Sequence, residues 1–172
     1  EGVINPLTAQ YVQRTLRYAD EEGAQALVLR MDTPGGLESS MREIVQATME
    51  APLPVIVYVA PRGARATSAG MFITLAAHVA AMAPASHIGA AHPVPLGQQV
   101  DETMAEKLTS DAAALVRTVA ENRERNVAWA ESAVRDNLSL TAEEALDENV
   151  IDLIAEDLDA LLVEIDGMEV ET

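Results

Sequence analysis

Two short apolar runs, each preceded by a helical pattern, constrain the fold of this chain more than any other feature. Residues 26–31 and 55–59 have the length and the apolar content of buried strands. Apolar residues recur at helical spacing before each run, between residues 6 and 24 and between residues 37 and 49. Helices that alternate with buried strands are typical of an α/β fold, whose functional loops follow the carboxyl ends of the strands.

The rest of the chain continues this alternation. After residue 60 we expect, in chain order, a small-residue helix from residue 69 to about residue 78, a strand over 79–83, a loop over 86–101, a long amphipathic helix from residue 101, a helix over 127–134, a capped helix beginning at Thr141, a strand over 150–154 and a final helix from residue 157. No internal repeat or linker divides the 172 residues, of which 49% are hydrophobic. We therefore expect residues 1–172 to form a single domain.

Composition excludes several functions. The formal net charge of −17 would repel phosphate backbones, so we expect no nucleic-acid partner. Most of the acidic excess lies after residue 100, where it is typical of a solvated helical surface; an acidic interaction face is the alternative. The absence of cysteine excludes thiol catalysis and disulfide bonds. The sequence has no metal-ligand motif and no phosphate-binding glycine loop, so we expect no metal or other cofactor.

Whether this chain could span a membrane depends on its longest apolar stretch, residues 70–85. This stretch is interrupted by His78 and is too short to span a bilayer comfortably. We expect the chain as given to be soluble. Because it begins at Glu1 without an initiator methionine, we also expect it to derive from a longer protein.

Ser68 is the candidate nucleophile. A serine hydroxyl attacks a carbonyl only with a neighbouring base and with donors for the oxyanion that forms. Ser68 precedes a predicted helix, so the amide of Ala69 and the positive end of the helix dipole would lie near the developing charge. The turn at Gly35 and Gly36 offers a second donor. The alternative is that Ser68 only caps its helix.

Two residues are candidates for the base. Lys107 is the only lysine among 11 lysine and arginine side chains, and an arginine cannot lose its proton. A buried lysine can, which suits Lys107 to a Ser-Lys dyad; the alternative is an ordinary surface lysine beside Glu106. His92 lies 24 residues after Ser68 and is the rival, because histidine is the commoner base.

Several motifs in this order resemble one family. They are DTPGG at 32–36, GARATSAG at 63–70, MAP at 82–84, IGA at 88–90, LSLTAEEA at 138–145 and VID at 150–152. Together they resemble the NfeD-type membrane serine proteases, also called stomatin operon partner proteins, which are similar to signal peptide peptidase A and the Clp protease subunit. The resemblance covers nearly the whole chain.

The resemblance implies a Clp-protease/crotonase-like fold, in which strand-strand-helix units form a spiral. It implies a Ser-Lys dyad of Ser68 and Lys107, with oxyanion amides from Ala69 and one or both of Gly35 and Gly36. Family members act on hydrophobic C-terminal segments of stomatin-like membrane proteins. By the same resemblance we expect a dimer or larger homo-oligomer, and a membrane-associated full-length protein with a signal sequence, membrane helices, a small β-barrel domain and an extracytoplasmic protease domain.

The sequence departs from the family pattern at two positions, and two other functions stay open. Thr67 stands where alanine is usual, and Glu124 stands where glycine is usual. A crotonase-like acyl-thioester hydratase or isomerase would share the paired oxyanion amides but would bind coenzyme A thioesters, which the negative charge disfavours. A non-catalytic scaffold would bind a stomatin-like partner, and its Ser68 would not react with serine-directed probes.

Overall fold

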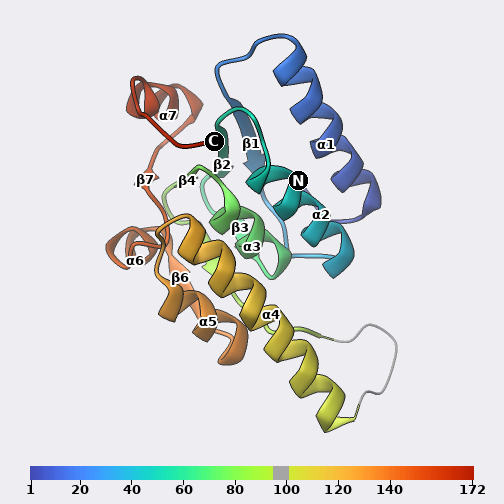
Figure 1. Ribbon diagram of the computed structural model, residues 1–172. Coiled ribbons are helices and arrows are strands. Elements are labelled where there is room, and N and C mark those ends of the chain that lie inside the picture. Colours follow the sequence, from blue (N-terminus) through green and yellow to red (C-terminus); the bar gives the residue numbers. More distant parts are fainter. Residues whose placement is uncertain (95–100) are drawn as a thin grey trace.

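The computed structural model describes residues 1–94 and 101–172 and contains a four-stranded parallel sheet (Figure 1). Its strands, in the spatial order β1-β2-β4-β7, are β1 (Leu27–Met31), β2 (Val55–Val59), β4 (Val79–Met82) and β7 (Leu153–Ile154). All neighbouring strands are parallel, as the alternation with helices predicts. The predicted strand at 150–154 is shorter than expected, because only its last two residues pair with β4.

A second sheet of three short strands was not predicted. It consists of β3 (Arg65–Thr67), β5 (His87–Gly89) and β6 (Ser139–Thr141), in that spatial order. The first pair is parallel and the second is antiparallel. The expectation of an irregular loop over 86–101 is therefore wrong at β5, and residues 95–100 of that loop lie outside the described residues. β3 of this sheet ends at Thr67, directly before Ser68.

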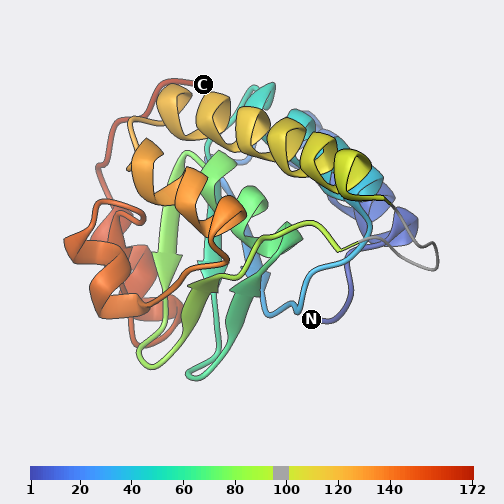
Figure 2. The same ribbon diagram turned by 90° about the horizontal axis from the view of Figure 1, so that it is seen from below.

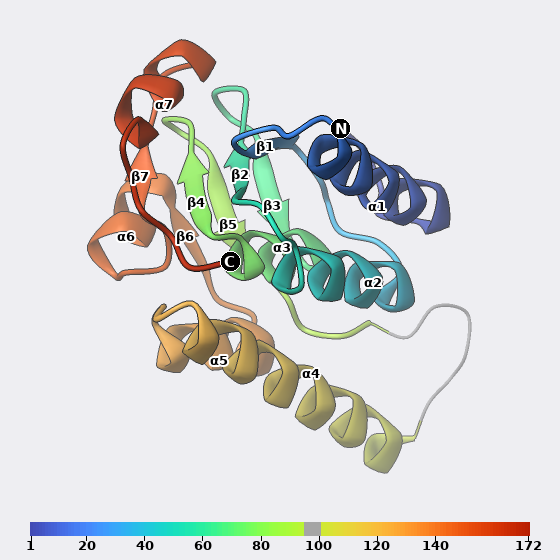
Figure 3. The ribbon, with the colours of Figure 1, turned by 45° about the horizontal axis from the view of Figure 1, so that its top comes forward.

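Seven helices are present in the described residues. They are α1 (Pro6–Glu21), α2 (Glu38–Met49), α3 (Ala69–Ala76), α4 (Glu102–Asn122), α5 (Val127–Arg135), α6 (Ala142–Asp147) and α7 (Leu158–Ile165). α2 packs between α1 and α3, while α4 packs against α3 and α5 (Figures 2 and 3). The predicted capping box at Thr141 is confirmed, and it begins α6.

The main sheet is buried on both faces. Val55, Val57 and Val59 of β2 belong to the larger core, which also contains the buried faces of α1 to α5. Ile56 and Tyr58 point to the opposite face and pack in a smaller cluster that includes Leu161 of α7. A parallel sheet covered on both faces explains why its strands are nearly continuous apolar runs in the sequence.

Arg125 is a buried cation that links α3 to the end of the sheet. Its Nε donates to the carbonyl of Leu75 at 3.2 Å, and Nη2 donates to that of Ala77 at 3.2 Å. The guanidinium also makes two hydrogen bonds to the carboxylate of Asp152, at 3.0 and 2.8 Å. The same carboxylate accepts from the amide of Ala80 at 2.6 Å. These bonds satisfy the buried charge and hold the carboxyl end of α3, the helix that follows Ser68.

Glu124 ends α4 in a left-handed conformation, with a φ of 53°. Its amide donates to Glu121 at 3.2 Å, and the amide of Arg125 donates to Ala120 at 2.8 Å. These two bonds form a Schellman motif, whose left-handed position usually holds glycine. The left-handed backbone at position 124 therefore explains why family members usually have glycine there.

Candidate functional site

Ser68 lies at the junction between β3 and α3, in a sparsely populated backbone conformation. Its φ is 53° and its ψ is −119°, and its side chain makes no capping hydrogen bond to α3. Ser68 thus occupies the N-cap position of α3, but its hydroxyl does not act as the cap that the alternative interpretation required. Its amide donates to the carbonyl of Gly89 in β5 at 3.0 Å, which fixes the backbone at this point. The hydroxyl is left for another partner.

Gly35 packs directly against the nucleophile candidate. A Cβ atom at Gly35 would lie 2.6 Å from Cβ and 3.1 Å from Oγ of Ser68, and the φ of Gly35 is 111°. Both the contact and the conformation require glycine at this position. The Gly35 amide donates to Oγ1 of Thr33 at 3.0 Å. Because this bond occupies the amide, Gly35 has no free donor for an oxyanion.

Gly36 is oriented by a parallel bridge to Ile4. The amide of Ile4 donates to the carbonyl of Gly35 at 2.8 Å, and the amide of Leu37 donates to the carbonyl of Ile4 at 2.9 Å. In this pairing, the N–H and C=O groups of Gly36 point away from Ile4. No described residue accepts a hydrogen bond from the Gly36 amide. The amide of Ala69, the first residue of α3, is likewise free of partners among the described residues.

A cavity of about 850 Å³ brings most of the candidate site residues together. Gly36, Ser68, Ala69 and His92 all line it. The other walls are largely apolar and include Val3, Leu37, Met41, Phe72, Val94, Leu108 and Ala112. The site thus combines a hydroxyl and two unpaired amides with an apolar surface, an arrangement suited to binding and polarising a carbonyl group.

His92 lines the cavity with its ring held from one side. Its Nδ1 lies 3.0 Å from the carbonyl of Val134, at the end of α5. A carbonyl only accepts, so we assign the proton of the neutral ring to Nδ1, which leaves Nε2 as an acceptor. No carboxylate of the described residues makes a hydrogen bond to this ring. The Val134 carbonyl thus occupies the position at Nδ1 where a catalytic triad would place its orienting carboxylate.

Lys107 is exposed on α4 and does not line the cavity in this structure. Leu108, the next residue, does line it. Among the described residues, the Lys107 amine makes no ion pair with an acidic side chain. The structure thus brings Ser68, Gly36, Ala69 and His92 together, whereas Lys107 is not among the residues that line their cavity.

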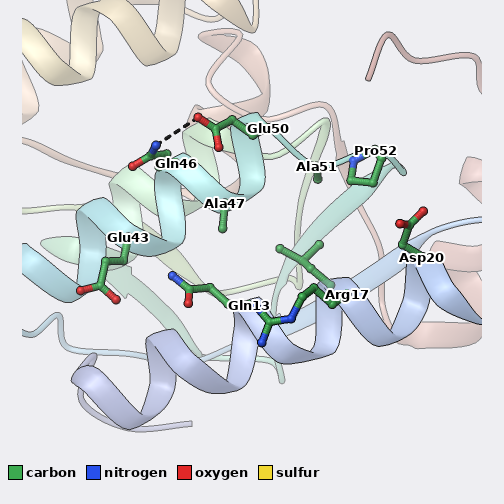
Figure 4. Close-up of a pocket in the computed structure, with 10 residues that line it drawn as sticks. Gln13, Arg17, Asp20, Glu43, Gln46, Ala47, Glu50, Ala51 and Pro52 are labelled. Carbon is green, nitrogen blue, oxygen red and sulfur yellow. Dashed lines mark hydrogen bonds between the residues drawn. The ribbon is translucent and has the colours of Figure 1, made fainter.

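A second cavity, of about 410 Å³, lies between α1 and α2 (Figure 4). Its walls carry Arg17 and the three carboxylates of Asp20, Glu43 and Glu50. Glu50 accepts a hydrogen bond from Gln46 at 3.0 Å (Figure 4). This cavity has no nucleophile beside unpaired amides, so the Ser68 cavity is the candidate active site.

Across residues 1–94 and 101–172, no three side chains of the metal-ligating types come together. Within the same ranges, no helix combines the length and apolar character needed to cross a membrane.

The fold and the site define a class of protein. The solved structure of ClpP1 from Listeria monocytogenes matches with a TM-score of 0.73 and 20% sequence identity, covering 93% of this chain and 91% of that chain. The chain therefore has a mixed α/β, Clp-protease-like fold, as expected.

The chain belongs to the family of NfeD1b N-terminal domains, whose model matches residues 1–169. It is 38% identical over 172 residues to the membrane-bound protease PH1510 of Pyrococcus horikoshii, covering 98% of this chain and 39% of that protein. The predicted resemblance is confirmed. The chain spans about two fifths of the length of this relative.

Two solved structures of the relative's N-terminal part agree closely with this chain. They show the 1510-N membrane-bound stomatin-specific protease as a serine-to-alanine mutant and as a lysine-to-alanine mutant in complex with a substrate peptide. Both match with a TM-score of 0.90 and 36% identity over 98% of this chain, and they are covered to 83% and 78% respectively. This chain is thus a homologue of a membrane-bound, stomatin-specific protease.

Proposed function

We propose that residues 1–172 form one protease domain, a serine endopeptidase that cleaves hydrophobic segments of membrane-associated, stomatin-like proteins. The observation that carries the proposal is the conformation of Ser68. Its strained backbone presents the hydroxyl, uncapped, in a cavity that it shares with the unpaired amides of Gly36 and Ala69. The homology to a stomatin-specific protease supports the same reaction class.

In the proposed mechanism, Oγ of Ser68 attacks the scissile carbonyl carbon and a base takes its proton. The carbonyl oxygen becomes an oxyanion and accepts from the amides of Gly36 and Ala69. The positive end of the α3 dipole adds to this stabilisation because Ala69 is the first residue of the helix. Gly35 serves a different role from the predicted one: it allows the turn to approach Ser68 closely.

Lys107 is the proposed base, which makes a Ser-Lys dyad with Ser68. The relative was studied as serine and lysine variants, and the altered lysine follows the altered serine there by about 40 residues, as Lys107 follows Ser68 here. An amine accepts a proton only when its charged form loses stabilising water. Leu108 lines the cavity, so the role of Lys107 requires that a peptide bound there extend over the exposed Lys107 and remove that water.

The substrate class follows from the cavity walls. Val3, Leu37 and Val94 are large apolar residues that line the cavity and remain exposed to solvent. Exposed apolar surface at a cavity favours an apolar ligand. We propose that a hydrophobic, C-terminal segment of a stomatin-like protein binds here, since the homologous protease is specific for a stomatin homologue.

The proposal also covers the oligomeric state of this domain and its location in the cell. Leu7, Tyr11 and Tyr18 of α1 are exposed and apolar, which supports a homo-oligomer of two or more copies. The homologue is a membrane-bound protease, and we propose that this domain belongs to a longer, membrane-associated protein and lies outside the cytoplasm.

The test is cleavage of a peptide with a hydrophobic stretch, measured between pH 6 and pH 9. Ser68→Ala should lower kcat by about 1000-fold or more, and Lys107→Ala by about 100-fold or more. Lys107→Arg is the matched control, because it keeps the positive charge but cannot accept a proton. It should be as inactive as Lys107→Ala, whereas His92→Ala should remain active.

Other outcomes would change the assignment. Undiminished cleavage by Ser68→Ala would refute the protease proposal. If Lys107→Ala stays active and His92→Ala loses activity, the base is His92.

A further inference from the structure

Thr33 contacts both the glycine turn at Gly35 and strand β3, which leads to Ser68. It is 1% exposed. Its backbone pairs with β3: the Thr33 amide donates to Arg65 at 2.8 Å, and its carbonyl accepts from the amide of Thr67 at 3.2 Å. Thr67 immediately precedes Ser68. The backbone of Thr33 therefore sets where the glycine turn lies relative to the nucleophile.

The side chain of Thr33 holds the glycine turn itself. Its Oγ1 accepts from the Gly35 amide at 3.0 Å and donates to the Gly35 carbonyl at 3.2 Å. The same carbonyl accepts from the amide of Ile4 at 2.8 Å. In a trans peptide, the carbonyl of one residue and the N–H of the next point in opposite directions. Fixing the Gly35 carbonyl therefore fixes the direction of the Gly36 N–H.

We infer that Thr33 is a positioning residue for catalysis, whose hydroxyl orients the Gly36 amide toward the oxyanion. This inference rests on the proposed protease function and assigns a role to a residue that touches neither the substrate nor the reacting atoms.

The hydroxyl is required because the turn has little intrinsic order. Two successive glycines have wide backbone freedom, and Gly35 has a φ of 111°. Without the hydroxyl, the buried Gly35 amide would lose its acceptor. The Gly35 carbonyl would keep only the Ile4 amide as a donor, so the Gly35–Gly36 peptide could rotate more easily. Such a rotation would turn the Gly36 N–H away from the oxyanion without changing the apolar walls of the cavity.

The experiment replaces Thr33 by valine, which keeps the shape but removes the hydroxyl, and by serine, which keeps the hydroxyl. Cleavage of the hydrophobic peptide is measured with kcat and KM separated. An oxyanion interaction acts in the transition state, so Thr33→Val should lower kcat on the order of 10- to 100-fold with little change in KM. Thr33→Ser should stay within about threefold of the wild-type kcat.

Thr67→Val is the matched control. It removes a neighbouring hydroxyl that donates to the Thr33 carbonyl at 3.2 Å but does not touch the glycine turn. Its kcat should stay within about threefold of wild type. If Thr33→Val does not fold, Thr33→Ala, which removes the methyl group together with the hydroxyl, should show the same loss of kcat.

The experiments distinguish a failure of the positioning role of Thr33 from a failure of the protease proposal. If Ser68→Ala abolishes cleavage but the folded Thr33→Val or Thr33→Ala protein keeps the wild-type kcat, the positioning role is refuted and the protease proposal stands. A loss of kcat in Thr33→Ser or Thr67→Val equal to that of Thr33→Val would also refute it, because the effect would then not depend on the Thr33 hydroxyl. Cleavage that persists in Ser68→Ala would instead refute the protease proposal.

Discussion

Acid should destabilise this fold through His78, an imidazole that is 9% exposed. Its Nδ1 accepts from the amide of Val55 at 3.1 Å, and its Nε2 lies 3.2 Å from Nη2 of Arg123. Both ring nitrogens thus face hydrogen-bond donors, and the neutral ring can accept from one of them. A protonated ring carries N–H groups at both positions and could accept from neither donor. Burial, and secondarily the charge of Arg123, lower the pKa of His78 from 6.5 to about 4.

The size of the effect follows from this pKa. In the unfolded chain His78 titrates near 6.5, so between pH 6.5 and pH 4 the unfolded state binds more protons than the folded state. The contribution of neutral His78 to stability is complete above pH 6.5 and is lost as the pH falls toward 4. The loss amounts to about 2 kcal/mol at pH 5 and about 3 kcal/mol below pH 4.

The assay is urea unfolding of wild type and His78→Asn at pH 8 and pH 5. The amide oxygen of asparagine can still accept from the Val55 amide but does not titrate. On moving to pH 5, the free energy of unfolding of the wild type should fall by about 2 kcal/mol more than that of the variant. Carboxylates contribute equally to both proteins and cancel in this difference.

His87 provides the matched control, because it is exposed on β5. His87→Asn should keep the full pH dependence of the wild type. Equal losses of stability in wild type and His78→Asn would refute the reasoning, and so would an NMR titration that places the pKa of His78 near 6.5.

Two further substitutions test the backbone arguments. Gly35→Ala would place a Cβ atom 2.6 Å from Cβ of Ser68, so cleavage of the hydrophobic peptide should fall on the order of 100-fold; activity close to wild type would show that the turn can move aside. Glu124→Gly should raise the free energy of unfolding by about 1 kcal/mol in urea titrations, because glycine adopts the φ of 53° without strain. An unchanged or lower stability would contradict the strain assigned to this position.

β1, β2, β4 and most of the helices were predictable from the sequence because each is long enough to form an apolar run or to show a helical period. The second sheet was not, because β3, β5 and β6 have three residues each. A run of three residues has no measurable periodicity, and its pairing joins segments far apart in the chain. Tertiary contacts, not local sequence, define these strands.

The candidate site was predictable in its residues but not in its hydrogen bonds. Motifs indicated Ser68 and the glycine turn, and the structure places them against each other. The sequence did not distinguish Gly35 from Gly36 as the donor. The proposal of Gly36 as the donor depends on the hydroxyl of Thr33 and on the pairing of Ile4, which are tertiary contacts of the turn. Thr33 had one local signal: it is a polar residue between a predicted strand, which ends at Met31, and the glycine turn.

The two candidate bases differ in what a bound peptide would do for them. His92 lines the cavity without a peptide, and its Nδ1 already has the Val134 carbonyl as a partner. Lys107 is exposed without a peptide, and its proposed role requires a chain that extends past Leu108 and removes water from its amine. The proposed Ser-Lys arrangement is therefore completed by the substrate itself. A base that becomes effective only when the cavity is filled would leave Ser68 weakly nucleophilic in the free protein and activate it once a substrate is bound.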